Sequence, residues 1–460
     1  MTDTEIRDTL INRMATHRID LERLVVIPSV SAAGFDHDEV RRCAHAVRDL
    51  LSARGCANAQ LLEVDGSHPA VYADWLDAGA DRPTVLCYAH YDVQPPGDAA
   101  AWTAPAFEPA ERDGRLYGRG AADDKAGIMV HVAAIDAWLS THDRVPCNIK
   151  VIIEGEEETG SGHLEQLLDT HGELLRADVV IITDSMNWKI GTPALTTSLR
   201  GLVDCVVEVA ALDHPLHSGM YGGAVPDPLT GLTRLLATLT NDDGVIAIPG
   251  FADDAPEPPA RRDLDALAFD VDEFRDEAGM LDGVELVGGD APVLERLWYR
   301  PAIAIIGLDA TGVDTASNTL AASARAKVSA RLAAGQDPHR AMDLLVGWLE
   351  MQAPWGLRVT VTPGAAGAGY RADPDRAEMK AARRAMQAAF DTEPVLIGLG
   401  GSIPLIAPLT QMFDDMPALL TGVEDPDTRA HGIDESLHLD DWYRACLAEA
   451  YLFAELAGEA

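Results

Sequence analysis

Residues 84–96 read TVLCYAHYDVQPP, an apolar run that ends in the polar triplet HYD. Similar short apolar runs stand at 148–153 (NIKVII) and 178–183 (DVVIIT), and helix-patterned segments such as 125–140 separate them. Strands that alternate with helices form a sheet with helices on both faces. We therefore expect an α/β fold with a doubly wound, mostly parallel sheet, and functional side chains at the strand ends.

The pattern changes near residue 200. There the sequence GLVDCVVEVAAL alternates like a half-exposed strand, a second such strand is indicated at 324–333, and a helix at 338–351. These are the ingredients of a smaller, inserted α+β domain, which we place at 200–368. The catalytic domain is then discontinuous, with parts at 1–199 and 369–460.

Composition limits the possible partners. The chain has 36 basic and 74 acidic residues, a net charge of −38. This charge opposes binding to nucleic acid or to anionic membrane surfaces and favours small molecules or cations, although an acidic surface also simply raises solubility. The charged N-terminus and the lack of a long apolar run predict neither secretion nor a membrane span. Six scattered cysteines without C-x-x-C spacing favour a reducing, cytoplasmic location.

An imidazole and a carboxylate stand two residues apart after the first apolar run. Residues i and i+2 of a strand point to the same side, so His90 and Asp92 can cooperate. We interpret His90 as a candidate metal ligand and Asp92 as the carboxylate that fixes its ring.

A second polar cluster, GRGAADDKAG, occupies 118–127. Its glycines suit a sharp turn, and Asp123 and Asp124 stand directly in front of a predicted helix. Two acids at that place are also typical of helix caps, so a structural and a metal-binding role both stay open.

The apolar run at 148–153 leads into EGEEETGSG at 154–162, which has four glutamates within five residues. Carboxylates that crowd together raise one another's pKa unless cations compensate, so a metal site with a neighbouring general base is a physical reason to gather them. A solvated acidic loop is the alternative. Asp184, at a strand end, and His431, in the polar loop DTRAHGIDES, complete the candidates.

Together these candidates are nitrogen and carboxylate ligands that a doubly wound sheet brings to one edge, a set that suits zinc, manganese or cobalt. Two histidines among the ligands disfavour a purely structural calcium site. The sequence has no G-x-S-x-G, no P-loop and no H-E-x-x-H motif. Metal-assisted hydrolysis is the chemistry that the residues favour.

The order and the residues of these motifs resemble those of the M20 metallopeptidases, in particular their cytosolic, carnosine-type dipeptidase branch. The resemblance runs through nearly the whole chain, in AHYDVQPP, WTAPAF, LYGRGAADDKAG, EGEEETGSG, ITDS, LRG, HPLHSGMYGG, GGSIP and RAHGIDES. It implies two divalent metal ions per subunit, zinc as the first expectation and manganese or cobalt as alternatives, and hydrolysis of a dipeptide or similar small amino-acid amide.

The resemblance also implies roles. His90 and Asp184 correspond to ligands of one metal, Glu158 and His431 to ligands of the other, and Asp123 to the bridging carboxylate. Asp92 corresponds to the carboxylate that orients the histidine ligand. Glu157 corresponds to the general base. His217 resembles a histidine that acts in the partner subunit's active site, which implies a homodimer and a lid and dimerisation role for the inserted domain. The substrate-binding positions correspond to Arg331, Asn318, Gly400, Gly401 and Ser402.

One departure affects the substrate. The dipeptidase branch commonly has R-E-G-G-S-I-P, whereas this chain reads GLGGSIP, with Gly398 and Leu399 in place of the charged pair. The lost glutamate could favour an N-acyl or N-carbamoyl amino acid over a free dipeptide. A binding or regulatory protein on a retired hydrolase fold is the non-enzyme alternative, but it predicts the loss of a ligand or of the base, and none is lost.

Overall fold

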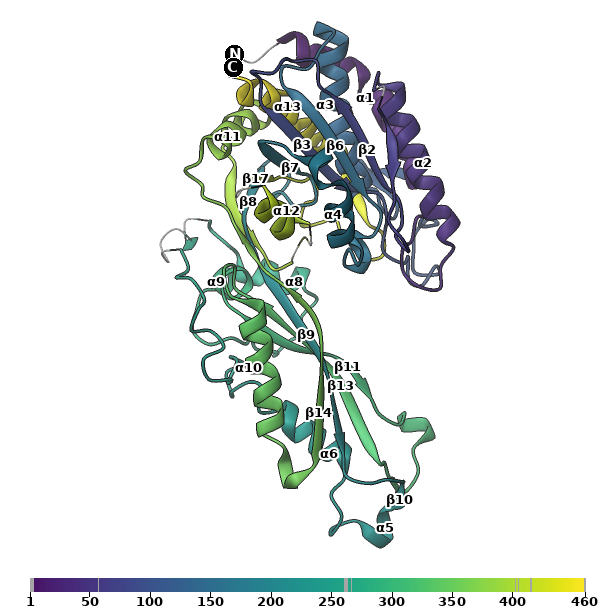
Figure 1. Ribbon diagram of the computed structural model, residues 1–460, viewed down its shortest axis with the longest axis vertical. Helices are drawn as coiled ribbons and strands as arrows, with labels where there is room; N and C mark the ends of the chain where they lie inside the picture. Colours follow the sequence, from purple (N-terminus) through teal and green to yellow (C-terminus); the bar gives the residue numbers. More distant parts are fainter. Residues whose placement is uncertain are drawn as a thin grey trace. The chain divides into compact units, whose positions relative to one another are not determined.

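The computed structural model describes residues 4–56, 58–259, 264–265, 267–401, 403, 405–413 and 416–458. The chain divides into two compact units. The first comprises the described residues of Met1–Thr197, Ala372–Ile397 and Ile403–Ala460, and the second those of Ser198–Arg371 and Gly398–Ser402. The first unit is thus assembled from separate stretches of chain, and Figure 1 labels its helices and its central strands β3, β6, β7 and β17. A lid and dimerisation role for the second unit stays a prediction.

The first unit is built on a mixed sheet with the strand order β1-β2-β6-β3-β7-β17-β8. The central strands β6, β3, β7 and β17 are parallel, whereas β2 pairs with β6, and β8 with β17, in antiparallel fashion. The predicted α/β class with a mostly parallel central sheet is confirmed. The strands are β1 (Gln60–Leu62), β2 (Ala70–Trp75), β3 (Thr84–His90), β6 (Asn148–Glu154), β7 (Val179–Ile182), β8 (Ala194–Leu199), β16 (Val395–Leu399) and β17 (Ala418–Leu420).

The helices of this unit include a packed group in which α3 contacts α1 and α13, and α13 contacts α11. Helix α3 reads KAGIMVHVAAIDAW, is apolar on nearly every side and is buried from Lys125 to Trp138, as a helix enclosed by others must be. The Trp138 indole donates to the Ala450 carbonyl at 2.8 Å, which fastens α3 to α13. The helices are α1 (Thr4–Val25), α2 (His37–Ala53), α3 (Lys125–His142), α4 (Leu164–Leu175), α11 (Ala377–Phe390), α12 (Ile406–Met412) and α13 (Leu439–Leu456).

A small sheet with the order β18-β5-β4 joins the C-terminal loop to the segment that precedes α3. Ser436 of β18 pairs with Tyr117 of β5. This pairing holds the loop that contains His431 beside the glycine-rich turn that contains Asp123. The strands are β4 (Ala110–Arg112), β5 (Arg115–Tyr117) and β18 (Ser436–His438), and a 3₁₀ helix spans Glu157–Thr159.

The second unit contains an antiparallel sheet with the order β11-β13-β9-β14. Helices α6 and α10 pack on it, and the alternating apolar residues of β9 and β13 form a core with Leu232, Leu235 and Leu345. Its elements are β9 (Gly201–Ala210), β10 (Leu216–His217), α5 (Ser218–Tyr221), α6 (Pro228–Leu236), α8 (Val271–Glu277), α9 (Val293–Trp298), β11 (Ala302–Asp309), β12 (Thr319–Leu320), β13 (Ser323–Leu332), α10 (Pro338–Met351), β14 (Arg358–Gly367) and β15 (Tyr370–Arg371), with 3₁₀ turns at Val313–Thr315 and Pro354–Gly356.

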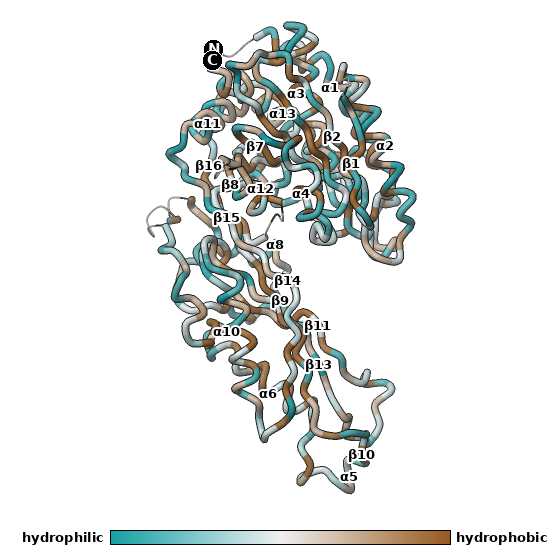
Figure 2. The backbone as a smooth tube through the Cα atoms, in the orientation of Figure 1, coloured by the Kyte–Doolittle hydropathy of each residue, from teal (hydrophilic) through white to brown (hydrophobic). Residues whose placement is uncertain are grey.

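Hydropathy follows this architecture. In Figure 2 the hydrophobic colour is concentrated along strands such as β7 in the first unit and β9 in the second. Among the described residues, no helix is both long and apolar enough to cross a membrane.

Candidate metal centre

His90 is the last residue of β3, and its side chain is only 1% exposed. Its Nδ1 lies 3.1 Å from the Asp92 carbonyl oxygen and 3.4 Å from Asp92 Oδ1. Because a carbonyl can only accept, Nδ1 carries the proton, and the Nε2 lone pair is left to face other groups. Nε2 lies 3.1 Å from Asp123 Oδ1 and 3.9 Å from Asp184 Oδ2, yet it has no well-aligned hydrogen-bond partner among the residues that the structure describes.

Asp123 joins this histidine to a second one. Its Oδ1 faces His90, and its Oδ2 lies 3.0 Å from His431 Nε2. His431 Nε2 is also 3.2 Å from Glu158 Oε2. Two groups of side chains could therefore each hold a metal ion, one made of His90, Glu157 and Asp184, and the other of Asp123, Glu158 and His431.

The acids around these histidines have strongly shifted pKa values. Burial, with added repulsion from Asp123 and Glu158, raises the pKa of Asp184 to about 7. Burial and the charge of Asp184 raise the pKa of Glu157 well above its usual range. Contacts with Asp123 and Glu158 raise the pKa of His431 to about 11. Negative charge is thus in excess, which is the condition that a bound cation relieves.

The residues fit a divalent metal. A buried imidazole nitrogen without a hydrogen bond, aimed at carboxylate oxygens while the other ring nitrogen is held by a carbonyl, is the arrangement of a histidine ligand. The mixture of imidazole and carboxylate donors suits zinc, manganese or cobalt. The structure therefore brings together the five predicted ligands His90, Asp123, Glu158, Asp184 and His431.

Asp92 connects the two groups. Its Oδ2 accepts from the Glu158 amide at 3.1 Å and from the Ser31 hydroxyl at 2.7 Å, while its carbonyl holds His90. Gln94 then fixes the carboxylate of Glu158, with its side-chain amide 2.8 Å from Oε2. Sequence reasoning missed Ser31 and Gln94. Only the position of Gln94, two residues after Asp92 in the HYDVQ stretch, could have drawn attention to it.

Two further buried acids support the turn that carries Asp123. Glu435 accepts from the amides of Ala122, at 3.0 Å, and Asp123, at 3.2 Å, and pairs with Arg119 at 2.6 Å. Asp124 contacts the backbone of a ligand, because its Oδ2 accepts from the His90 amide at 3.2 Å. Sequence reasoning missed Glu435, although it lies within the motif RAHGIDES.

The remaining predicted residues belong to the second unit. His217 is exposed at the end of β10, where its Nδ1 accepts from the Gly219 amide at 3.1 Å. The carbonyl of Asn318 accepts from the Ser218 amide at 2.9 Å, so Asn318 and His217 are neighbours. Arg331 is half-buried on β13, and burial lowers its pKa. Gly400 and Gly401 follow β16, with the Gly400 carbonyl 3.2 Å from Arg200 Nε, and Ser402 lies outside the described residues.

Comparison with known proteins identifies the family. The profile of Peptidase family M20/M25/M40 matches residues 86–455. This chain belongs to that family. The resemblance inferred from the motifs is confirmed, and with it the expectation of a metallopeptidase.

Relatives of this M20 peptidase include dipeptidases. The chain is 36% identical over 374 residues to the cysteinylglycine-S-conjugate dipeptidase of Corynebacterium striatum, a match that covers 80% of each protein. It is 29% identical over 412 residues to the Beta-Ala-His dipeptidase of Homo sapiens, covering 85% of this chain and 78% of that protein. The crystal structure of human carnosine dipeptidase 1 superposes with a TM-score of 0.83 at 26% identity, over 99% of this chain and 98% of that one.

Proposed function

We propose that this M20 peptidase hydrolyses the amide bond of a dipeptide or a similar small amino-acid amide at a centre of two divalent metal ions. The observation that carries the proposal is the position of Asp123, whose two carboxylate oxygens face histidines of two different ligand groups. A carboxylate in that position suits a bridge between two ions. The names of the two relatives compared above, both dipeptidases, support the substrate class.

The ligand groups suggest how the ions are held. His90 and Asp184 would hold one ion, Glu158 and His431 the other, and Asp123 would serve both. Zinc is our first expectation, and manganese or cobalt are the alternatives. Two such ions, when bound, polarise a scissile carbonyl and lower the pKa of a water molecule.

Glu157 is the group that we assign to proton transfer. It stands next to the ligand Glu158 in the 3₁₀ helix, and burial together with Asp184 raises its pKa. A carboxylate with a raised pKa can take a proton from the attacking water and then return it to the leaving amine. Asp92 acts through His90, since it holds the ring in the tautomer that leaves Nε2 without a proton.

The second unit would supply substrate recognition. Arg331 has a planar guanidinium that suits the carboxylate of a dipeptide, and Asn318 and the backbone of Gly400 and Gly401 offer polar groups. Arg200 adds a second guanidinium next to the Gly400 carbonyl, and both its burial and the charge of Arg331 lower its pKa, to about 10. Two neighbouring cations favour an anionic group of the substrate. Ser402 belongs to the same proposal by resemblance alone.

We infer a cytoplasmic homodimer in which His217 acts in the partner's active site. Support comes from β11, one of the two edge strands of the sheet β11-β13-β9-β14, where Ile305, Ile306 and Leu308 are 50%, 58% and 50% exposed. An exposed apolar edge strand readily pairs with another chain. All six cysteines are buried thiols, which suits a reducing compartment.

The test of the reaction begins with removal of metal by a chelator and separate restoration of zinc, manganese or cobalt. Turnover is then measured on Cys-Gly, β-Ala-His and other free dipeptides, and on N-acetyl and N-carbamoyl amino acids. Glu157→Gln is the blank, and Glu165→Gln, an exposed glutamate on α4, is the matched control. We expect metal-restored cleavage of free dipeptides by the natural chain and by Glu165→Gln, with at least a hundredfold loss in Glu157→Gln.

Other results would redirect the proposal. Cleavage of the blocked amino acids alone would favour the amidohydrolase alternative, for which the substitution of Gly398 and Leu399 for a charged pair is the specific observation. Absence of metal-dependent turnover on every substrate would favour the binding-protein alternative.

The dimer is tested by complementation. His217→Ala and Glu157→Gln protomers are each expected to be nearly inactive alone. If His217 acts across the interface, a mixed dimer contains one site with natural Glu157 and a natural His217 from its partner, so mixing restores part of the activity. No recovery on mixing, or a monomer in sedimentation analysis, would contradict the shared site.

A further inference from the structure

One imidazole outside the metal groups contacts the segments that carry their ligands. His131 lies on α3, the helix that follows Asp123 and Asp124, and is completely buried. Its Nε2 is 3.0 Å from the Tyr88 carbonyl, two residues before His90, and 3.2 Å from Thr183 Oγ1, one residue before Asp184. A single ring thus touches the end of β3 and the end of β7 from the helix that begins after Asp123.

The protein fixes the orientation of this ring. A carbonyl oxygen only accepts, so Nε2 carries a proton toward Tyr88. Nδ1 lies 2.8 Å from Glu449 Oε1 on α13, a hydrogen-bond distance, and a proton lies between the two atoms. Rotation of the ring would break both contacts in a site without water access, because His131 and Glu449 are 0% and 4% exposed.

The surrounding contacts are tight. Thr183 donates its hydroxyl and its amide to the same Tyr88 carbonyl, at 3.4 and 3.3 Å. A Cβ on Gly127 of α3 would lie only 2.5 Å from Thr183 Oγ1, so the first turn of α3 rests directly on the residue before Asp184. The Trp442 indole of α13 donates to the Ala126 carbonyl at 3.3 Å and keeps Glu449 in place relative to α3.

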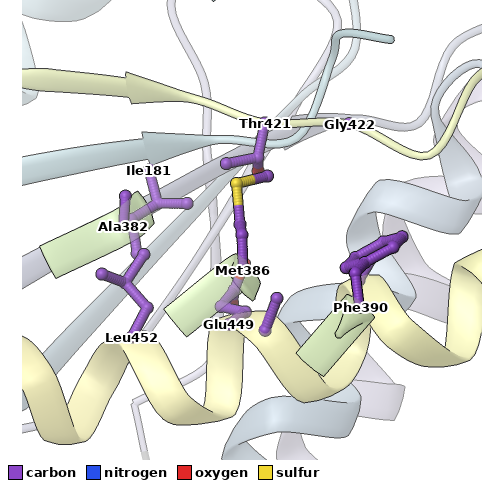
Figure 3. A pocket seen from close by; sticks show the side chains of 10 residues that line it. Ile181, Ala382, Met386, Phe390, Thr421, Gly422, Glu449 and Leu452 are labelled. Carbon is purple, nitrogen blue, oxygen red and sulfur yellow. The ribbon is translucent and has the colours of Figure 1, made fainter. Parts of the chain in front are cut away.

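The other side of Glu449 faces a small cavity. Figure 3 shows its side chain with those of Ile181, Met386 and Thr421 in the cavity wall, which is mostly apolar. Among the described residues, no protein group hydrogen-bonds to Glu449 Oε2. The hydrogen bond that holds this carboxylate in place is therefore the one between its Oε1 and His131.

We propose that His131, held by Glu449, is a positioning residue that keeps the strand ends carrying His90 and Asp184 at a fixed spacing from Asp123. It does not touch substrate or metal. The inference rests on the proposed function in that it assigns the pair to the same metal centre. Removing the pair should weaken metal binding and lower kcat, with a smaller effect on KM.

The experiment compares His131→Leu, His131→Gln and Glu449→Gln with a matched control. His17→Leu removes another fully buried histidine that lies against α3, with Nε2 3.3 Å from Asp136 Oδ2. Asp136 lies in the second half of α3, away from Asp123. Metal dissociation constants are measured by chelator competition without substrate, kcat and KM at saturating metal, and Tm on the stripped proteins.

We expect His131→Leu and Glu449→Gln to weaken metal binding about 10- to 100-fold and to lower kcat by a similar factor. His131→Gln, which retains a donor toward Tyr88, should recover most of both losses. His17→Leu should lower Tm but leave metal affinity within about twofold, as expected of a site beyond the outer ligand shell.

Two outcomes would overturn the proposal. In the first, His131→Leu and Glu449→Gln lower Tm like the control and leave metal affinity unchanged. In the second, the natural chain binds a third metal equivalent that disappears with His131→Leu and with Cys87→Ala, since Cys87, His131 and Glu449 could themselves hold an ion. Because metal affinity is read without substrate, weakened binding in a chain that fails to cleave dipeptides would count against the proposed function alone.

Discussion

The two histidines of the metal centre are held in opposite ways. His90 ends a buried strand, is 1% exposed in its side chain, and has Nδ1 fixed by Asp92. His431 lies in a loop, is 58% exposed in its side chain, and has a backbone φ of 61°, in the left-handed region that non-glycine residues avoid. Arg429 and Asp434 of the same loop also have positive φ values, 56° and 57°.

The difference shows two ways to position a ligand. On the His90 side, the core of the first unit fixes the ligand, so the site and the stability of the fold depend on the same residues. On the His431 side, local loop geometry and a few hydrogen bonds fix the ligand at the surface. We therefore expect substitutions on the His90 side to affect both metal binding and folding, and substitutions on the His431 side to affect metal binding alone.

The largest effect is expected where the two sides meet. Asp123→Asn removes the charge that faces both histidines. Both ions should be lost, and turnover should fall by about a thousandfold or more, because each histidine keeps at most one charged ligand partner. The metal content per chain after dialysis measures the loss of ions, and the turnover of Cys-Gly measures the loss of activity. Asp77→Asn, an exposed aspartate, is the control, and retention of two ions by Asp123→Asn would contradict the bridging position.

The comparison of His90→Ala with His431→Ala separates the two sides directly. His90→Ala leaves buried carboxylates without their partner, and the free energy of unfolding of the metal-stripped protein should fall by about 3 kcal/mol. His431→Ala removes a largely exposed side chain and should change the free energy of unfolding by less than about 1 kcal/mol. Both should lose one ion. Urea unfolding and metal titration measure these quantities; equal destabilisation by the two variants would mean that the sides do not differ.

Two glycines sharpen the comparison. A Cβ on Gly127 would lie 2.0 Å from Asp124 Oδ1 and 2.5 Å from Thr183 Oγ1, whereas one on Gly432 would lie 3.0 Å from the Arg429 carbonyl oxygen. Gly127→Ala should destabilise the fold by about 1 to 3 kcal/mol through overpacking, and Gly432→Ala by clearly less. Thermal unfolding of both variants measures the effect. A larger loss of stability in Gly432→Ala than in Gly127→Ala would mean that the loop with His431 is the more rigid part of the site.

The smallest effect is expected at the anchor of the His431 loop. The Thr103 hydroxyl donates to Asp434 Oδ2 at 2.6 Å at an exposed position. Thr103→Val keeps the shape and removes this bond, at a cost of about 1 kcal/mol or less. Affinity for one of the two ions should fall by up to about fivefold, and stability should not change measurably. Chelator competition measures the affinity for each ion. Loss of both ions would contradict an effect that is limited to the loop with His431.

Much of the first unit follows from local sequence. The apolar runs that begin at residue 84 and at 148–153 and 178–183 were expected to be strands, and they are found as Thr84–His90, Asn148–Glu154 and Val179–Ile182. The helix expected at 125–140 extends over Lys125–His142. These segments are long or strongly apolar, so their pattern alone identifies them. The ligands could be named because each stands where such a segment ends.

The remainder depends on contacts between distant residues. The antiparallel pairing of β2 with β6 was not predicted, because strand direction depends on connections that local pattern does not encode. The Ser31 hydroxyl donates to Asp92, the Gln94 amide donates to Glu158, and Glu435 accepts from backbone amides. His131 and Glu449 are separated by 318 residues. The sequence of an apolar helix with one histidine does not reveal whether that histidine contacts an acidic residue of another helix.

The discontinuous first unit has a consequence for biosynthesis. His90, Asp123, Glu158 and Asp184 leave the ribosome early, but β17, the loop with His431 and α13 with Glu449 come from the last part of the sequence, beyond residue 403. A nascent chain that has emerged only as far as the second unit therefore lacks both a strand of the central sheet and one of its two metal-facing histidines. Metal capture by the complete centre must therefore follow translation of the segment that contains His431, long after the other four ligands have been made.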